Sequence, residues 1–245
     1  MKPFRYLNLA TSLIEWRSLR AGTDKCSLCR SPVTVKLGSS EHSIRCIRCG
    51  ANPSAMSLGH VLQSCKVDLG TSHIYELSSR GPLFRYLTKH ATALTCSEYF
   101  DDVVPGEVRN GVTCQDVQNL LFEDQSFDIC TSTDVFEHVA DDGKAFAELH
   151  RVLKPGGLAM FTVPLDIRSN TVERAKVVNG AIEHLMEPEY HGDHIRGLGQ
   201  IFCFRNYGAD ITTRLELAGF QRAEIITSCQ PLWWGYGRSI VVAEK

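Results

Sequence analysis

The sequence contains no apolar run approaching the roughly 20 residues that cross a lipid bilayer. It also contains no repeats and no low-complexity tracts, which argues against fibrous and disordered classes of protein. Residues 1–20 lack the uninterrupted apolar core of a secretion signal, because Arg5, Glu15, Arg17 and Arg20 lie among the apolar residues. We therefore expect a cytoplasmic protein that has no membrane partner.

Glycine is scarce where a nucleotide-binding fold usually needs it. The stretch IYELSSRGPLFRYL, residues 74–87, passes from a short apolar run through a serine-rich turn into a helix-like segment. Gly81 is its only glycine. The turn is therefore a degraded cofactor loop, a specialised cofactor loop, or an ordinary strand-to-helix corner.

The chain lacks a strong net charge, since its formal net charge is −2, but the two signs are unevenly distributed. Residues 1–57 hold nine Lys and Arg against three acidic residues, whereas the remainder holds 25 acidic and 17 basic residues. Such an asymmetry indicates two modules. The basic module is either a surface for RNA or a face that docks on the acidic domain or is simply solvated.

A disulfide framework is not expected because nothing indicates secretion, so the ten cysteines favour metal binding. Cys26 and Cys29 form one CxxC pair and Cys46 and Cys49 a second, with sixteen residues between the pairs. A hairpin of that length can bring four thiolates together around Zn²⁺ in a closed tetrahedron, which is a structural site. Gly50 would permit the tight turn of the second pair. A redox CxxC needs one such motif at a helix start rather than two matched ones.

Short apolar runs recur after residue 70, and helix-like segments separate several of them. The clearest helix covers residues 143–153, where Phe146, Leu149 and Val152 share one face. Strand–helix alternation predicts a parallel sheet covered on both sides, with its ligand beyond the carboxyl ends of the strands. The expected strands cover residues 74–77, 92–97, 112–115, 127–132 and 158–163.

Both ends of this domain are less regular. Ser57 is expected to cap a short helix over residues 58–64. After residue 164 the regular pattern lapses, and a helix resumes over residues 207–218 and ends at Gly219. Two closing runs, 224–227 and 239–243, lie too close together for a parallel crossover, so we expect an antiparallel pair.

Residues 114–157 carry several short sequence motifs in a fixed order. In this order they resemble the central part of class I S-adenosylmethionine-dependent methyltransferases (methyltransferase-11-like), and the closing strand pair resembles that family's antiparallel hairpin. The resemblance implies a Rossmann-like seven-stranded α/β sheet that binds S-adenosylmethionine. The motifs are Asp116, Leu120-Leu121-Phe122, Ser126-Phe127-Asp128, Glu137-His138-Val139, and Arg151 through Gly157.

The N-terminal part adds a second resemblance. The stretch CIRCGANPSAMSLGHVL is similar to the zinc-knuckle lead-in of some bacterial methyltransferases. We therefore expect an N-terminal helix and a four-cysteine zinc ribbon in residues 1–57. The methyltransferase domain would occupy residues 58–245, with a substrate lid over residues 165–206.

The cofactor residues follow from this frame. A carboxylate after the second strand can accept both ribose hydroxyls, and Glu98 stands 22 residues after Glu76, close to the spacing in dinucleotide folds. The resemblance implies that Asp116 accepts a hydrogen bond from the adenine amino group, with Val117 beside the ring. With these neighbours, residues 74–87 are interpreted as a specialised cofactor loop. The other expected cofactor residues are Glu76, which keeps the acidic place of the family's first loop, and Ser78, Ser79, Gly81, Tyr99 and Thr133.

The acceptor site is expected in the irregular region after strand five. In residues 184–197, His191 or His194 could take a proton from a hydroxyl with Asp193 orienting the ring, and His191 is preferred. The alternatives are a divalent metal site that binds a substrate diol, and a solvated loop without chemistry. His138 is a further candidate base or a support for its loop. Trp233, Trp234 and Tyr236 either stack on a substrate ring or belong to the core.

Three hypotheses about function follow. The first is a methyltransferase that acts on an O or N atom of a small molecule, such as a sugar or natural-product intermediate. The second is an enzyme of the same fold that methylates ribosomal RNA and grips it with the basic ribbon. The third is a non-catalytic zinc-binding protein whose methyltransferase fold has lost its cofactor. A homo-oligomer is left open.

Overall fold

The computed structural model describes residues 15, 17, 19–40, 43–65, 67–193, 199–227, 231–232 and 235–245, without the side chains of Asp193, Pro231 and Tyr236. The expected N-terminal helix in residues 1–14, His194 and the Trp233–Trp234 pair therefore lie outside the described residues. None of the helices in the described ranges has the length and apolarity needed to cross a membrane.

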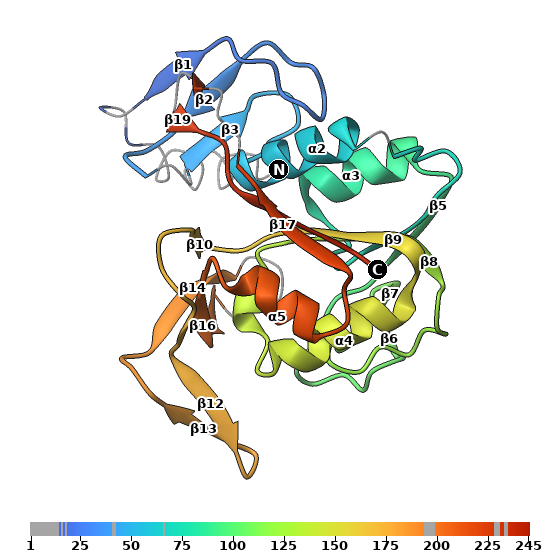
Figure 1. Ribbon diagram of the computed structural model, residues 1–245. Helices are drawn as coiled ribbons and strands as arrows, with labels where there is room; N and C mark the ends of the chain where they lie inside the picture. Colours follow the sequence, from blue (N-terminus) through green and yellow to red (C-terminus); the bar gives the residue numbers. More distant parts are fainter. Residues whose placement is uncertain are drawn as a thin grey trace, which may run out of the picture.

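A six-stranded sheet forms the centre of the described structure, in the order β17-β20-β9-β8-β4-β5 (Figure 1). The strands from β9 to β5 run parallel, and β20 and β17 add to the β9 edge as an antiparallel pair. The Rossmann-like α/β class with a closing antiparallel hairpin is thereby confirmed. The six strands are β4 (His73–Glu76), β5 (Ala93–Cys96), β8 (Phe127–Thr133), β9 (Leu153–Thr162), β17 (Arg222–Ile226) and β20 (Ile240–Glu244).

Two helices lie on each side of this sheet (Figure 1). On one side are α2 (Pro53–Ser64) and α3 (Gly81–His90), and on the other are α4 (Asp142–Val152) and α5 (Ile211–Leu217). The helix expected at 143–153 is therefore confirmed as α4. Its N-cap is the Asp141 side chain, which accepts a hydrogen bond from the Lys144 N–H at 3.0 Å.

Two predicted helix starts are wrong. The helix α2 begins earlier than expected, because the Asn52 side chain accepts the Ala55 N–H at 2.9 Å and Pro53 fills the first helical position. Ser57 therefore lies inside α2, where its hydroxyl accepts the Arg238 N–H at 2.9 Å. Tyr207, expected to start the last helix, lies in the strand β16 (Arg205–Gly208) instead.

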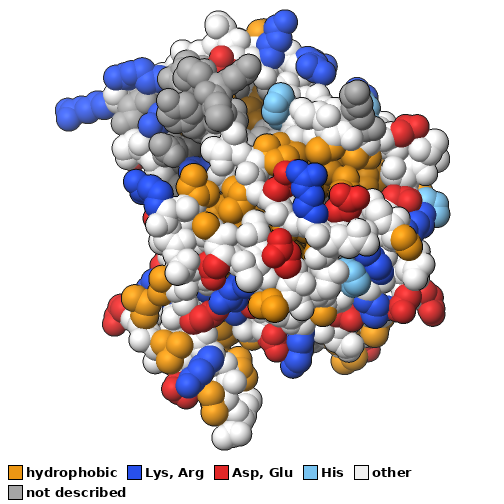
Figure 2. Space-filling view, in the orientation of Figure 1, with side chains coloured by type: hydrophobic (Ala, Val, Ile, Leu, Met, Phe, Trp, Pro, Cys, Tyr) orange, Lys and Arg blue, Asp and Glu red, His pale blue; other side chains and the backbone are white. Residues whose placement is uncertain are grey.

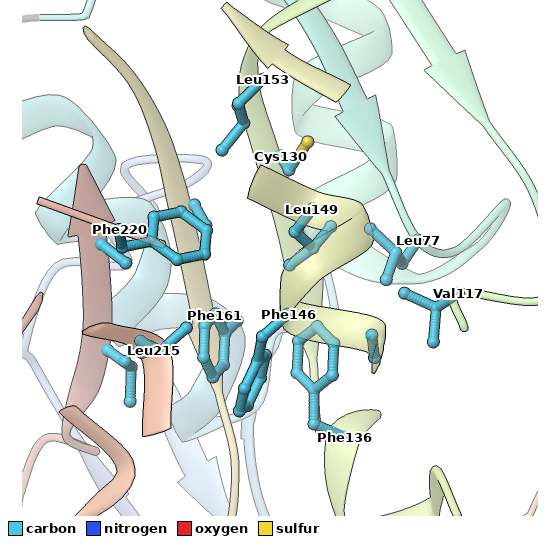
Figure 3. Close-up of a cluster of buried hydrophobic side chains, with 14 of the residues drawn as sticks. Leu77, Val117, Cys130, Phe136, Phe146, Leu149, Leu153, Phe161, Leu215 and Phe220 are labelled. Atoms are coloured by element: carbon cyan, nitrogen blue, oxygen red, sulfur yellow. The ribbon is translucent and has the colours of Figure 1, made fainter. Parts of the chain in front are cut away.

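Both faces of the central strands are buried, because neighbouring residues of a strand point to opposite faces. Tyr75, Cys130 and Phe161 belong to the cluster under α4 and α5, part of which Figure 3 shows. Ile74 and Ile129, their neighbours in sequence, belong to the cluster under α2 and α3. This packing explains why these strands read as continuous apolar runs rather than as alternating ones.

Of the seven strands that the sequence predicts, the one at residues 112–115 is shorter than expected and does not join the central sheet as a full strand. Only β7 (Val112–Thr113) is a strand, and it pairs antiparallel with β6 (Val108–Arg109) in a separate hairpin. Cys114 keeps a single parallel bridge to Glu98. That bridge marks the place of a strand beside β5, at the edge of the sheet.

The segment after β9 is built from short strands, although the sequence pattern lapses there. β10 (Leu165–Asp166), β16 and β11 (Val172–Glu173) form a three-stranded sheet. The hairpins β12–β13 (Ala175–Val178, Ala181–His184) and β14–β15 (Glu189–Asp193, Gly199–Cys203) follow, and β12–β13 projects from the body (Figure 1). The function of residues 165–206 as a lid stays a prediction.

A three-stranded antiparallel sheet, β1 (Arg20–Gly22), β2 (Thr34–Lys36) and β3 (Ile44–Cys46), forms the N-terminal module. It packs on α2, where the Ser27 hydroxyl donates to the Met56 carbonyl at 2.6 Å. The Gln63 amide donates to the Ser27 carbonyl at 2.8 Å. Because α2 runs through the expected module boundary at residue 57, it connects the two modules as one continuous element.

Candidate functional site

The four cysteines of the N-terminal module lie together. Their sulfur atoms are all within 4.8 Å of one another, with 3.6 Å between Cys26 and Cys49 and 3.4 Å between Cys29 and Cys46. In a zinc tetrahedron with bonds of about 2.3 Å, two sulfur atoms are roughly 3.8 Å apart. Four thiols at this spacing fit a closed structural zinc site.

The turns that hold these cysteines are nearly identical. In the first, the Arg30 N–H donates to the Cys26 carbonyl, and in the second the Gly50 N–H donates to the Cys46 carbonyl, both at 2.9 Å. Both closing residues have positive φ, 60° for Arg30 and 71° for Gly50. Gly50 thus has the role expected from the sequence, whereas Arg30 adopts a conformation that a side chain disfavours.

Glu98 and the loop after β4 form one unit at the carboxyl edge of the sheet. One oxygen of its buried carboxylate accepts three hydrogen bonds, from the Ser79 N–H at 2.8 Å and from the hydroxyls of Ser79 and Ser78 at 2.9 and 3.1 Å. The serines in the place of glycines therefore anchor the loop to the residue expected to hold ribose. Sequence reasoning named all three residues but did not foresee this bond between them.

The start of α3 faces open space at the same edge. Gly81 has φ +87°, and a Cβ added there would meet no atom within 4 Å. Arg80 occupies the N-cap position without a side-chain cap. A helix start with free N–H groups next to the loop suits a negatively charged group such as a carboxylate.

The remaining expected cofactor residues also lie near this edge. Asp116 accepts two hydrogen bonds from Gln118, from its N–H at 2.9 Å and its side-chain amide at 3.1 Å. Val117 is buried in the core cluster beside Leu77 (Figure 3). Tyr99 is 45% exposed, and Thr133 ends β8. Their contacts with a cofactor stay predictions.

Asp134, which sequence reasoning missed, follows β8 directly. It has φ +53°, and its carboxylate accepts the Ser54 hydroxyl at 3.1 Å and the Thr162 hydroxyl at 2.9 Å. Non-glycine residues with such a backbone cluster at functional sites. These bonds tie the start of α2 to the carboxyl edge, so α2 both supports the ribbon and borders the site.

Glu137 is the second residue that the sequence did not single out, because it was named only within the motif Glu137-His138-Val139 and given no role. It lies in the short helix η2 (Phe136–His138) just after β8, and its side chain is fully buried. Neither carboxylate oxygen has a hydrogen-bond partner among the residues that the structure describes. Burial raises the pKa of Glu137 to about 7. The sequence signal was an acidic residue and a histidine directly after a buried strand.

Two imidazoles face this carboxylate. His138 Nε2 lies 3.5 Å and His191 Nδ1 lies 3.7 Å from Glu137 Oε1. The two rings meet edge to face with centroids 5.0 Å apart. The Glu137 carboxylate, and then Glu189, raise the pKa of His191 against the opposing effect of burial. The fold therefore joins two histidines that lie far apart in the sequence.

Asp193 and His184 are the other groups of this segment that were expected near His191. The backbone of Asp193 pairs with Gly199 in the β14–β15 hairpin, while its side chain lies outside the described residues. His184 is exposed in β13, and its ring meets Phe202 edge to face. Among the described side chains, the Glu189 carboxylate lies 3.1 Å from His191 Nε2, and the role of Asp193 stays a prediction.

The segment that carries His191 is tightly bound to the loop that carries Glu137. The Phe204 N–H donates to the Glu137 carbonyl at 2.7 Å. The buried Arg205 guanidinium donates to the carbonyls of Phe136, Val139 and Ala140. This attachment fixes the positions of Glu137 and its two imidazoles relative to the sheet edge.

Residues 77–161 match the sequence model of a family described as a methyltransferase domain. The matched range begins directly after β4 and ends within β9, so it contains Glu98, Asp134 and η2. This part of the chain is therefore similar to a methyltransferase domain, as the order of its motifs implied.

Two curated relatives match parts of the chain. A glycine/sarcosine/dimethylglycine N-methyltransferase from Actinopolyspora halophila is 39% identical over 134 residues, which are 55% of this chain and 20% of the relative. A phthiotriol/phenolphthiotriol dimycocerosates methyltransferase from Mycobacterium ulcerans is 31% identical over 86 residues, 34% of this chain and 31% of the relative. The chain thus spans less than a third of either relative's length.

Two matches to solved structures have low sequence identity and TM-scores below 0.5. An S-adenosylmethionine-dependent methyltransferase from Mesorhizobium loti has a TM-score of 0.49 at 17% identity, over 76% of this chain and 97% of that one. The 1,6-didemethyltoxoflavin-N1-methyltransferase from Burkholderia thailandensis, solved with its substrate and S-adenosylhomocysteine, has a TM-score of 0.49 at 15% identity. That match covers 78% of this chain and 77% of the other.

Proposed function

We propose that the chain is an S-adenosylmethionine-dependent methyltransferase that methylates an O or N atom of a small molecule. The observation that carries the proposal is the methyltransferase-domain match over residues 77–161, which includes the serine loop bound to Glu98. The curated relatives are named as methyltransferases of small amino acids and of a lipid, which favours a small acceptor.

The cofactor would lie across the carboxyl ends of β4, β5 and β8, where ligands of such sheets bind. Glu98 would accept the ribose hydroxyls, Asp116 would accept the adenine amino group, and the N–H group of Gly81 at the start of α3 would face the methionine carboxylate. When bound, S-adenosylmethionine supplies an activated methyl group on a positively charged sulfur. The protein's contribution is to align the acceptor with that methyl group and to exclude water.

The acceptor would meet the cofactor beside Glu137, His138 and His191. For a hydroxyl acceptor, His191 has two possible roles: an imidazole that takes the proton, or a ligand of a cation that binds the oxygen. A general base contributes roughly 10²- to 10⁴-fold in rate. His138 fits a supporting role better, because its ring is bonded to the Phe202 carbonyl at 2.8 Å. A role for Asp193 stays a prediction.

The ribbon would carry one structural Zn²⁺ on Cys26, Cys29, Cys46 and Cys49. The sulfur distances and the paired turns support this proposal. The ion would stabilise the module that packs on α2, and it would take no part in the methyl transfer.

RNA is the alternative acceptor that one observation favours. A cavity of about 680 Å³ between the ribbon and α3 is lined by basic side chains, among them Arg30, Arg48, Arg85 and Lys89. However, Arg48 and Arg85 donate hydrogen bonds to the carbonyls of Cys29 and Cys49, at 3.4 and 2.7 Å. Since a hydrogen bond within the ribbon occupies Arg48 and a hydrogen bond that docks the ribbon on α3 occupies Arg85, the small-molecule acceptor is preferred.

Calorimetry with S-adenosylmethionine and S-adenosylhomocysteine tests the cofactor site in zinc-loaded protein. We expect one binding site per chain. Glu98→Gln should weaken binding about 10-fold, because hydrogen bonds to a charged acceptor are worth about 1 kcal/mol more than those to a neutral one. Glu107→Gln, an exposed neighbour, is the matched control and should bind as the wild type does.

Two outcomes would contradict the proposal. Absence of heat with both ligands in folded, zinc-loaded protein would favour the non-catalytic binding protein. Salt-dependent binding of RNA, with a steep loss of affinity as salt rises, would favour the RNA enzyme.

A further inference from the structure

We propose that Glu137, His138 and His191 form a binding site for one divalent first-row transition-metal cation, whose open position takes an oxygen atom of the methyl acceptor. The role toward the acceptor rests on the proposed function, whereas the binding of the cation does not. The site lies where η2 and the β14–β15 hairpin meet.

The three side chains have the right separation. Each offers one ligand atom, and these atoms lie within 4.8 Å of one another, with 3.5 and 3.7 Å from the Glu137 oxygen to the two imidazole nitrogens. Two ligands at about 2.1 Å from a tetrahedral cation are roughly 3.4 Å apart. A cation can therefore be bound between them with only small movements of the side chains.

Hydrogen bonds behind the ligands fix the tautomers that metal binding needs. The Phe202 carbonyl, 2.8 Å from His138 Nδ1, can only accept, so this nitrogen carries the hydrogen and Nε2 holds the lone pair in the neutral ring. Glu189 lies 3.1 Å from His191 Nε2, which leaves the lone pair on Nδ1. Both lone-pair nitrogens are those nearest to Glu137. Metal-bound histidines usually have such a carbonyl or carboxylate behind them.

The buried carboxylate is an independent observation. Glu137 is 0% exposed and, within the described part of the chain, neither of its oxygens has a hydrogen-bond partner. A carboxylate in that position is costly unless a charge or a donor compensates it. A cation between Glu137 and the imidazoles would supply the missing partner.

A second group of possible ligands, Glu189, His191 and Cys203, shares one histidine with the first. The Cys203 thiol donates to the Arg205 carbonyl at 3.1 Å, and burial raises its pKa to about 11. Glu189 is paired with Arg174 at 3.1 Å and accepts the Asn206 amide at 3.4 Å. These groups are therefore support for His191 rather than ligands.

The donor set selects the kind of cation. Two imidazoles and one carboxylate suit zinc, iron, cobalt, nickel or manganese better than magnesium or calcium, which prefer oxygen ligands. Three protein ligands leave at least one position open. An acceptor hydroxyl bound there would have a lowered pKa. The hydroxyl proton would be lost to solvent as the acceptor binds the cation. The oxygen would then bond to the methyl carbon while the carbon–sulfur bond breaks with its electron pair left on sulfur.

The test uses the full chain with one zinc already in the ribbon. Mn²⁺ is added and the free ion is followed by electron paramagnetic resonance, because thiolates bind Mn²⁺ poorly. We expect about one bound Mn²⁺ per chain, which Zn²⁺ displaces. Glu137→Gln and His191→Ala should each weaken this binding at least about 10-fold, as loss of one ligand implies, while the ribbon keeps its zinc. His184→Ala, which removes an exposed histidine of the same segment, should bind Mn²⁺ as the wild type does.

Glu137→Gln keeps the shape of the side chain, and His191→Ala changes a partly exposed ring, so at least one variant should remain folded by circular dichroism. If the wild type binds neither Mn²⁺ nor a second Zn²⁺, or if both folded variants bind like the wild type, the site is wrong. Protein that binds S-adenosylmethionine but neither of these added cations would disprove the metal site and leave the methyltransferase proposal intact. Protein that binds Mn²⁺ but not S-adenosylmethionine would disprove the methyltransferase proposal and leave the metal site intact.

Discussion

Glu76 and Glu137 are both buried carboxyl groups at the carboxyl edge of the sheet, and their surroundings separate their roles. Glu76, at the end of β4, accepts a hydrogen bond from the Thr131 hydroxyl within the sheet. Glu137 instead faces two imidazole nitrogens at 3.5 and 3.7 Å. The first is satisfied as a neutral acid inside the fold, whereas the second has no hydrogen-bond partner among the described residues, and a cation between it and the imidazoles would compensate its charge.

Glu76 should make stability depend on pH. Burial is the main cause that raises the pKa of Glu76 to about 8 from an ordinary 4.5. The hydrogen bond from Thr131 opposes this rise, and the nearby Glu98 charge adds to it. A raised folded-state pKa means that the unfolded chain loses this proton first. The free energy of unfolding should therefore fall as pH rises from about 5 to 8, by at most about 1.4 kcal/mol per pH unit.

Urea unfolding of the cofactor-free protein at several pH values across this range measures the fall. Glu76→Gln, which stays neutral at every pH, should give a flatter dependence and a higher stability than the wild type at the alkaline end. Parallel curves for the two proteins would show that Glu76 does not titrate in this range.

Some contacts of single residues could not be predicted from the sequence. The serines of the loop 77–80 could be identified as small residues beside a cofactor, but their bonds to Glu98 depend on how β4 and β5 align. Glu137 and His191 lie far apart in the sequence, so only the return of β14–β15 to η2 brings them together. Periodicity predicts which face a residue occupies and not which distant residue it meets.

At the scale of elements, the strands and α4 could be predicted because their apolar pattern is strong and local. The segment 165–208 could not, since its strands are two to five residues long and mostly exposed. Its position comes from a few charged side chains instead. Arg205 and Arg214 pair with Asp142 and Glu173 and connect this segment to the start of α4.

Arg205 should be the residue that holds the segment on the body. Arg205→Met would remove the guanidinium donor from the carbonyls of Phe136, Val139 and Ala140. It would also remove one partner of a buried ion pair, so we expect a loss of about 3–5 kcal/mol in the free energy of unfolding. The control is Arg222→Met, because the exposed pair of Arg222 with Glu224 should contribute less than about 1 kcal/mol.

Chemical denaturation of both variants measures the difference. Equal effects of the two substitutions would mean that Arg205 is not a structural anchor. A folded Arg205→Met that also loses Mn²⁺ binding would indicate that this anchor positions His191.

At the scale of the whole molecule, the basic N-terminal module docks on the face of the sheet covered by α2 and α3. Figure 2 shows Lys and Arg side chains around this module, and Figure 1 shows it next to β19 (Gly235–Tyr236). Charge asymmetry predicted two modules, but it could not predict that the buried cysteines and α2 share one core with Met160 of the sheet.

The tightest point of this docking is Gly59 in α2. A Cβ at Gly59 would lie 2.2 Å from Cδ2 and 3.1 Å from Cγ of Leu28, a buried residue of the first cysteine turn. Helix propensity alone predicts that Gly→Ala stabilises a helix by about 1 kcal/mol. Overpacking costs about 1–3 kcal/mol, so we expect Gly59→Ala to destabilise the protein and to weaken the retention of zinc.

Two matched variants separate these effects in thermal unfolding and in zinc release to a chelator. Gly143→Ala in the first turn of α4, where the nearest atom to the new Cβ is an Asp141 oxygen at 3.4 Å, should stabilise the protein or leave it unchanged. Leu28→Ala in the Gly59→Ala background should recover part of the loss, because it removes the clashing methyl groups. If Gly59→Ala stabilises the chain as Gly143→Ala does, the ribbon is not held at this contact, and α2 serves the catalytic domain alone.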